Sequence, residues 1–296
     1  HYSPGVQVST TTPAFDSIIM EPFGYTNGVS LVGLNGGNGW SGAWSVGAGT
    51  FTIVTNQGSG SVPRFFNQPP YPDHSGNRVR FSNPGNGNQA NASRSFDPVT
   101  SGFLYAAAVM SYQFEGTEKW FGMSLMSNTT EKIFVGKLFD VSEQREFGIN
   151  GPNITKTGSG QNLSPFGGSG GNTGNVYLVI LRYNFSTREV DALRYHRTQN
   201  PPAVEPGSWT VSVTAPVGDV NMVNGIRLSG GSGDATGTIG EGFFDEIRVA
   251  TTWADLFNQV GVVATNYQIG NATNYVFDSQ VNQGTFPVVM TLRSET

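Results

Sequence analysis

Short segments rich in valine, isoleucine, phenylalanine and tyrosine recur along the chain, and clusters of glycine, asparagine and proline separate them. Such segments favour β-strands, and the clusters between them mark turns and loops. In one segment, Ile226 and Leu228 point to one face while Arg227 points to the other, which is typical of a strand with one face on a core. The pattern predicts strands at Thr50–Thr55, Asn77–Ser82, Ser93–Phe96, Phe103–Gln113, Lys119–Met126, Lys132–Phe139, Val176–Phe185, Glu189–Arg197, Asn224–Ser229 and Phe243–Thr251.

This number of strands suits two packed antiparallel sheets. The alternation is less clear in the segment that ends at Arg197. There, Val190, Ala192 and either Leu193 or Tyr195 must be divided between the two faces of a strand, and the sequence alone does not divide them.

The remaining elements are long loops and one short helix. A helix of about two turns is predicted from Thr252, an N-cap residue, because Trp253 and Phe257 follow at a spacing that places them on one helical face. Long loops, mostly rich in glycine, are predicted at Asn56–Gly76, Gly151–Asn175 and Gly230–Glu241.

Composition strengthens the case for an all-β chain. Charged residues make up only 12% of the 296 positions, where about 25% is usual. The chain has 40 glycines, 20 phenylalanines and 10 tyrosines, and such residues favour turns and pleated, half-buried surfaces over helices. It has no cysteine, which excludes disulfides and thiol chemistry. We therefore expect a β-sandwich held together by its packed core or by bound ions.

Charge and hydropathy exclude two classes of partner. The net charge is −5 without a long block of either sign, so the basic footprint that nucleic-acid binding requires is missing. The longest candidate for a membrane span, Val176 to Leu181, is far too short and is interrupted at once by Arg182.

Two features suggest that the protein is secreted and works outside the cell or at its surface. The chain begins at His1, with neither an initiator methionine nor a signal peptide, as a secreted chain does once its leader has been removed. It also carries Asn-x-Ser/Thr sequons, which mark accessible loops and sites of N-glycosylation. These begin at Asn91, Asn128, Asn153, Asn162, Asn184 and Asn271.

Three parts of the chain resemble a large group of LamG-like, concanavalin-fold secreted proteins found mainly in bacteria. They comprise Phe15–Ser17 with Glu21–Tyr25 and Leu34–Trp44, then Trp120–Leu125 with Lys132–Lys137, and finally Phe243–Trp253. The resemblance implies a jelly-roll sandwich over residues 14–257. Outside it, the strand character of both ends predicts an N-terminal arm at 1–13 and a C-terminal β extension at 258–296. It does not imply one activity, because the same fold carries lectins, hydrolases, lyases and adhesion modules.

No catalytic pattern stands out, and we do not expect an enzyme. Glu189 and Asp191 start a Glu-x-Asp pair like that of retaining glycosidases, but Arg194 stands where the closing glutamate should be. The pair is interpreted as solvent-facing. The histidines His1, His74 and His196 lie far apart in sequence, which disfavours a histidine-based metal or acid–base site.

Calcium is the cofactor that the sequence allows, since it prefers carboxylates and loop carbonyls. By the resemblance, Asp245 is the best candidate ligand, with Glu21 and carbonyls of the Gly33–Gly39 loop as companions. The alternative is that Asp245 caps a turn or pairs with an arginine.

Aromatic side chains are the candidates for sugar binding, because their flat faces stack on sugar rings. Large aromatic residues are more often part of a core, so this alternative stays open for each of them. The candidates are Trp40, Trp44, Tyr71, Trp120 and Trp209.

Two functions remain open. The first is a non-catalytic structural protein, a subunit of a self-associating filament, surface layer or matrix, in which a terminal strand pairs with a neighbour's sheet edge. The alternative is a carbohydrate-binding module or adhesin that holds an extracellular polysaccharide. The residues expected to mediate assembly are Val6, Val8, Phe286, Val288, Met290 and Leu292.

Overall fold

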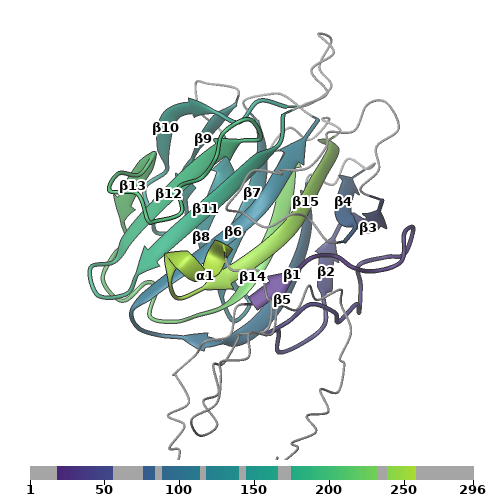
Figure 1. Cartoon of the computed structure of the whole chain (residues 1–296), viewed down its shortest axis with the longest axis horizontal. Coiled ribbons are helices and arrows are strands. Elements are labelled where there is room, and N and C mark those ends of the chain that lie inside the picture. Colours follow the sequence, from purple (N-terminus) through teal and green to yellow (C-terminus); the bar gives the residue numbers. More distant parts are fainter. Residues whose placement is uncertain are drawn as a thin grey trace, which may run out of the picture. The chain divides into compact units, whose positions relative to one another are not determined.

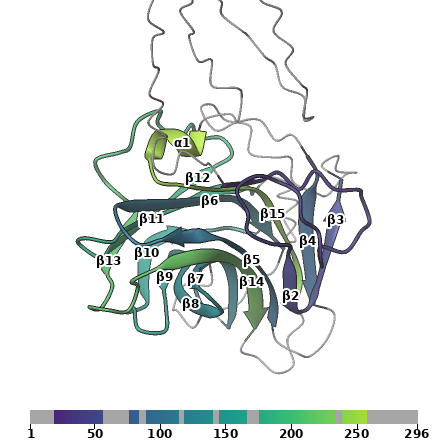
Figure 2. The same ribbon diagram turned by 90° about the horizontal axis from the view of Figure 1, so that it is seen from below.

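A computed structural model describes residues 19–55, 76–83, 89–113, 118–139, 145–165, 175–232 and 239–257. The chain divides into two units, His1–Phe257 and Asn258–Thr296, and all described residues belong to the first. In that unit two antiparallel sheets pack face to face (Figures 1 and 2). The all-β sandwich of the jelly-roll type is confirmed.

The first sheet has eight strands. Their order is β13-β12-β11-β6-β15-β4-β3, with β1 paired to β15. The strands are β1 (Ile19–Glu21), β3 (Thr50–Val54), β4 (Arg78–Asn83), β6 (Phe103–Tyr112), β11 (Tyr177–Asn184), β12 (Glu189–His196), β13 (Val211–Thr214) and β15 (Ile239–Ala250).

The second sheet has seven strands, in the order β10-β9-β8-β7-β14-β5-β2. These are β2 (Ser45–Ala48), β5 (Gln89–Val99), β7 (Lys119–Ser127), β8 (Thr130–Lys137), β9 (Glu146–Asn150), β10 (Thr157–Asn162) and β14 (Val223–Ser232).

All ten predicted strands overlap observed ones, and five short strands, β1, β2, β9, β10 and β13, were not predicted. The loop prediction for Gly151–Asn175 is wrong where β10 runs through it. The prediction for Gly230–Glu241 is wrong at both ends, which belong to β14 and β15. In each case the segment is rich in glycine and polar residues, which predict a loop, but pairing with adjacent strands stabilises it as a strand.

Phenylalanine rings from both sheets meet in the centre of the core. Phe121 of β7 lies 4.6 Å from Phe244 of β15 and 5.5 Å from Phe81 of β4, measured between ring centroids. A Cβ atom at Gly230 or Gly242 would approach the Phe81 ring to 2.5 or 2.0 Å. Glycine at these two positions therefore makes room for the aromatic centre.

The outer face of the eight-stranded sheet is also apolar near its middle. Leu178 and Ile180 of β11 are fully buried there, in a cluster with Leu193 of β12. Val190 and Ala192 belong instead to the core between the sheets, so Leu193 and Tyr195 share the outer face.

The predicted helix is confirmed as α1 (Trp253–Phe257), which packs on the outer side of this sheet (Figure 2). Thr252 caps it: its hydroxyl accepts the N–H of Asp255 at 3.3 Å and donates to the Asp255 carboxylate at 2.5 Å. Across the described ranges, no helix is long and apolar enough to cross a membrane.

A buried ion pair connects the N-terminal part of the sandwich to the seven-stranded sheet. Glu21 of β1 and Arg94 of β5 form a salt bridge whose side chains are 0% and 1% exposed. The same carboxylate accepts hydrogen bonds from the Phe23 N–H at 2.9 Å, the Tyr25 hydroxyl at 2.8 Å and the Trp44 indole at 2.9 Å. Burial and the Glu21 charge raise the pKa of Tyr25 to about 12.

Arg94 in turn organises the glycine-rich loop that follows β1. Its guanidinium donates to the Gly42 carbonyl and to the Asn35 side chain, both at 2.7 Å, and lies 4.9 Å from the centre of the Trp40 ring. The segment from Glu21 to Trp44 is thus wrapped around one cation.

We expect Arg94→Met to lower the free energy of unfolding by about 3–5 kcal/mol, because it leaves the Glu21 carboxylate buried without its cation. Urea denaturation measures the change. Arg80→Met is the matched control, since the Arg80–Glu241 pair has side chains 37% and 39% exposed and such pairs contribute only about 0–1 kcal/mol. Equal costs for the two substitutions would show that the buried pair does not stabilise the fold.

Candidate functional site

The outer face of the seven-stranded sheet carries a groove of about 370 Å³. Strand periodicity builds it: on each strand every second side chain enters the core, and the side chains between them face outward. On β14, for example, Ile226 and Leu228 are core residues while Arg227 and Ser229 line the groove, as the sequence predicted for Arg227. The lining residues are Gln89, Asn91, Trp120, Glu131, Phe134, Phe139, Asn150, Arg227 and Ser229.

A row of four glycines crosses this face on adjacent strands. Gly122 of β7 pairs with Gly136 of β8, which pairs with Gly148 of β9, which pairs with Gly158 of β10. A Cβ atom at Gly122 would lie 2.1 Å from the Val135 carbonyl oxygen. The close approach of the backbones therefore requires glycine in the middle of the sheet.

The glycine row lets two large side chains lie flat on the sheet. A Cβ atom at Gly122 would come within 2.7 Å of the Phe134 ring, and one at Gly148 within 2.6 Å of the Leu138 side chain. Phe134 is only 6% exposed although it faces away from the core. Because the Phe134 ring lies close against the strands at Gly122, it leaves the groove open beside it.

A polar cluster forms one side of the groove. The Glu131 carboxylate accepts a hydrogen bond from the Ser124 hydroxyl at 2.7 Å and forms an ion pair with Arg227. Burial lowers the pKa of Arg227, and its Nε atom is buried without a hydrogen-bond partner among the described residues. This side of the groove offers charged and hydrogen-bonding groups with little net charge.

An aromatic pair, Trp120 and Phe139, also lines the groove. The ring of Trp120, at the start of β7, meets the ring of Phe139, just after β8, edge to face at 5.6 Å between centroids. Both side chains are partly exposed. Trp120 is therefore the one candidate aromatic residue, within the described ranges, that the structure brings to the groove.

The other aromatic candidates lie elsewhere. Trp44 is 2% exposed and belongs to the core, so its ring has no free face for a sugar, and that prediction is wrong. Trp40 is partly buried between Trp44 and Arg94, and Tyr71 lies outside the described residues.

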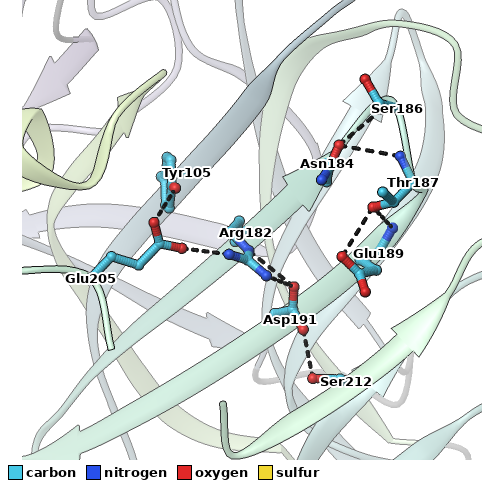
Figure 3. A network of polar contacts seen from close by, with 9 residues as sticks. All are labelled: Tyr105, Arg182, Asn184, Ser186, Thr187, Glu189, Asp191, Glu205 and Ser212. Carbon is cyan, nitrogen blue, oxygen red and sulfur yellow. Dashed lines mark hydrogen bonds and ion pairs between the residues drawn. The ribbon is translucent and has the colours of Figure 1, made fainter. Parts of the chain in front are cut away.

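Trp209 belongs to a network on the opposite sheet, together with Asp191 of the glycosidase-like pair, and its ring lies 4.6 Å from the Arg182 guanidinium. Arg182 donates to Asp191 at 2.7 Å and to Glu205 at 2.5 Å (Figure 3). Tyr105 donates to Glu205 at 2.9 Å. Asp191 is buried, so the interpretation of Glu189 and Asp191 as a solvent-facing pair holds for Glu189 only.

This network joins the segment before β13 to the sheet and satisfies its own charges. The hydroxyl of Ser212 donates to Asp191 at 2.5 Å, so both carboxylate oxygens of Asp191 accept hydrogen bonds. Burial alone would lower the pKa of Arg182, but the hydrogen bonds and charges of Asp191 and Glu205 raise it overall. We assign the network to stability.

The candidate calcium ligands are engaged with protein groups. Glu21 is bound by Arg94 and three further donors, so a guanidinium holds the place expected for the cation. Asp245 accepts the N–H of Glu246 at 2.9 Å. No three acidic or histidine side chains come together in the part of the chain that the structure describes, and calcium binding by Asp245 and Glu21 stays a prediction.

The sequons differ in their surroundings. Asn91 lines the groove, whereas Asn128, Asn153 and Asn162 are exposed at turns and on β10. Asn184 accepts the N–H groups of Ser186 and Thr187, as Figure 3 shows. The sixth sequon, Asn271, and the expected assembly residues Val6, Val8, Phe286, Val288, Met290 and Leu292 lie outside the described residues.

Comparisons with known proteins identify no family. No protein-family model matches the chain, and no curated protein matches it; membership of the LamG-like group stays a prediction.

Several solved structures are distantly similar to the chain. A botulinum neurotoxin type C, described with two ganglioside molecules, has 8% identity and a TM-score of 0.41, over 76% of this chain and 48% of that one. Lectin I-B4 from Griffonia simplicifolia has 11% identity and a TM-score of 0.34, over 58% and 87%. The catalytic domain of a glycoside hydrolase family 131 protein from Coprinopsis cinerea has 9% identity and a TM-score of 0.37, over 69% and 84%. A likeness this weak says nothing of ligand or activity.

We expect Gly122→Ala to destabilise the protein by about 1–3 kcal/mol, because the added methyl group overpacks the close contact with β8 and the Phe134 ring. Thermal and urea unfolding measure the loss. Gly207→Ala is the control, since no atom lies within 4 Å of its Cβ position. If both substitutions are neutral, the glycine row is not required by packing.

Proposed function

We propose that the protein is a secreted, extracellular carbohydrate-binding module that holds a neutral polysaccharide in the groove of the seven-stranded sheet. The observation that carries the proposal is the combination, in one groove, of a partly exposed aromatic pair with amide and hydroxyl side chains. Ligand sites in proteins usually measure about 300–1,000 Å³ and place a few polar groups among apolar ones. The groove has this size and this mixture.

The two kinds of side chain fit the two sides of a sugar ring. The C–H face of a pyranose packs against an aromatic ring such as Trp120, which is amphipathic and rigid. The hydroxyl groups need donors and acceptors, which Gln89, Asn91 and Asn150 supply as amides with both functions.

Charge supports a neutral ligand rather than an acidic one. The positive charge of Arg227 is paired with Glu131, whose side chain is 24% exposed, so the groove lining carries one charge of each sign. A uronic acid would place a carboxylate beside Glu131 without a free cation to receive it.

The groove supports binding without cleavage. Glycosidases that work by acid–base or nucleophilic catalysis use two carboxyl groups, about 5–10 Å apart, on either side of the scissile bond. Glu131 is the single carboxylate among the described lining residues, and Arg227 and Ser124 hold it. We therefore propose a binding role and no hydrolysis.

The self-associating structural role stays a prediction. Its expected contacts lie outside the described residues, whereas the groove lies inside them. The groove favours the carbohydrate-binding alternative as the proposed function.

Trp120→Ala should weaken polysaccharide binding by about tenfold or more, because truncation of an aromatic anchor in a binding site costs roughly 1–2 kcal/mol or more. Isothermal titration or affinity electrophoresis against soluble glucans, mannans, galactans and uronans measures it. Trp209→Ala on the opposite sheet is the control and should bind as wild type does. The proposal fails if no neutral polysaccharide binds the wild-type protein, or if both variants bind equally well.

An N-glycan on Asn91 should abolish binding, because its first sugars would fill the groove that the side chain lines. Protein from a glycosylating secretory host is compared with the same chain from a non-glycosylating host, and occupancy of Asn91 is read by mass spectrometry. Ser93→Ala removes the sequon while leaving Asn91 in place, and should restore binding in the glycosylating host. Full binding by protein occupied at Asn91 would place the ligand elsewhere.

A further inference from the structure

A buried lysine lies where the two aromatic residues of the groove are attached to the sheet. Lys137, the last residue of β8, is 0% exposed, and its side chain shares the core face with Ile133 and Val135. Its ammonium group donates to the carbonyl oxygen of Lys119 and, at 3.3 Å, to that of Leu138.

These two carbonyl groups directly precede the aromatic pair. Lys119 is followed by Trp120 and Leu138 by Phe139, so each carbonyl belongs to the peptide bond that carries an aromatic residue. One ammonium group therefore links the start of β7 to the end of β8, next in sequence to the two rings, whose centroids lie 5.6 Å apart. The ammonium group adds to the strand pairing of Phe121 with Lys137, while the Lys156 ammonium group donates to the Phe139 carbonyl at 2.9 Å.

The surroundings make that charge sensitive to pH. Burial, and next the positive charge of Lys119 on β7, lower the pKa of Lys137 to about 8. On the other neighbour, β9, Phe147 is paired with Lys137, while the carboxylate of the adjacent Glu146 accepts the Gly160 N–H at 3.2 Å. The pKa of the ammonium group thus lies near pH 8 instead of at its ordinary value of 10.5.

We propose that Lys137 is a positioning residue of the groove, whose ammonium group holds Trp120 and Phe139 in place, so that ligand binding weakens when it loses its proton. The neutral amine keeps two N–H groups but loses the charge that strengthens its hydrogen bonds to the carbonyls. The effect on glycan affinity rests on the proposed function, whereas the effect on the mobility of Trp120 does not.

The sign of the pH effect separates local from global changes. Because the pKa of Lys137 in the folded protein lies below its ordinary value of 10.5, the unfolded chain binds more protons between these two values. The contribution of Lys137 to global stability therefore rises with pH over this range. Affinity for the ligand is expected to fall over the same range, so the two changes have opposite directions and a fall in affinity does not report unfolding.

The first experiment follows Trp120 without any ligand. Acrylamide quenching of tryptophan fluorescence is measured from about pH 6.5 to about pH 9.5 in the wild type and in Trp120→Phe, and the difference isolates Trp120. We expect it to become more accessible with a midpoint near pH 8, and to show no such step in Lys137→Arg, whose charge persists, or in Lys137→Met. A flat wild-type difference overturns the proposal even if neither Lys137 variant folds.

The second experiment measures affinity for the neutral polysaccharide that the wild type binds. We expect the dissociation constant to rise by up to about thirtyfold across this range, following the protonated fraction of Lys137, and to stay constant in Lys137→Arg. A quenching step without a change in affinity would retain Lys137 as the group that positions Trp120 but place the ligand elsewhere, which counts against the proposed function. A change in affinity that persists in Lys137→Arg would assign the pH effect to another group and overturn the proposal.

Discussion

The pairing of buried charges determines how distant parts of this chain meet. Only 12% of the residues are charged, and several of them are buried, where a charge is stable only beside a partner. Glu21 and Arg94 lie 73 positions apart, so their salt bridge requires the segment after β1 to fold against β5. The opposite face of β5 carries Asn91, one side of the groove. A contact in the core thereby fixes the position of a residue on the face that carries the groove.

The sequence predicted the longer strands, in which apolar residues run together or alternate with polar ones. Central strands of the two sheets, such as β6, β7, β11 and β15, contain enough valine, phenylalanine or leucine to be recognised as strands. Strand β10 consists largely of glycine, serine and threonine, and β2 and β13 have only four residues each, so pairing with a neighbour stabilises these strands rather than their own composition. A single sequence does not show such pairing.

Of the candidate site, the sequence predicted a type of residue but not a place. Trp120 was one of five aromatic candidates, and residue type alone did not distinguish it from the buried Trp44. Glu131, Arg227 and Asn150 were not predicted as site residues, because each is an ordinary polar position on a strand until the register brings them together. The alternation around Arg227 did show that this side chain leaves the core, and the same argument applied to each strand of the sheet would have found the rest of the face.

The glycine row divides the positions of this face into those that packing fixes and those that are free to vary. A Cβ atom at Gly122 would lie 2.1 Å from the Val135 carbonyl oxygen and 2.7 Å from the Phe134 ring, so the row itself tolerates little change. Under the proposed function, variation at the lining positions Gln89, Asn91 and Asn150 would alter which hydroxyl groups the site recognises, while the packed strands of the glycine row stay the same. Selection or engineering could then exchange one ligand for another at the margin of the groove without rebuilding the sheet.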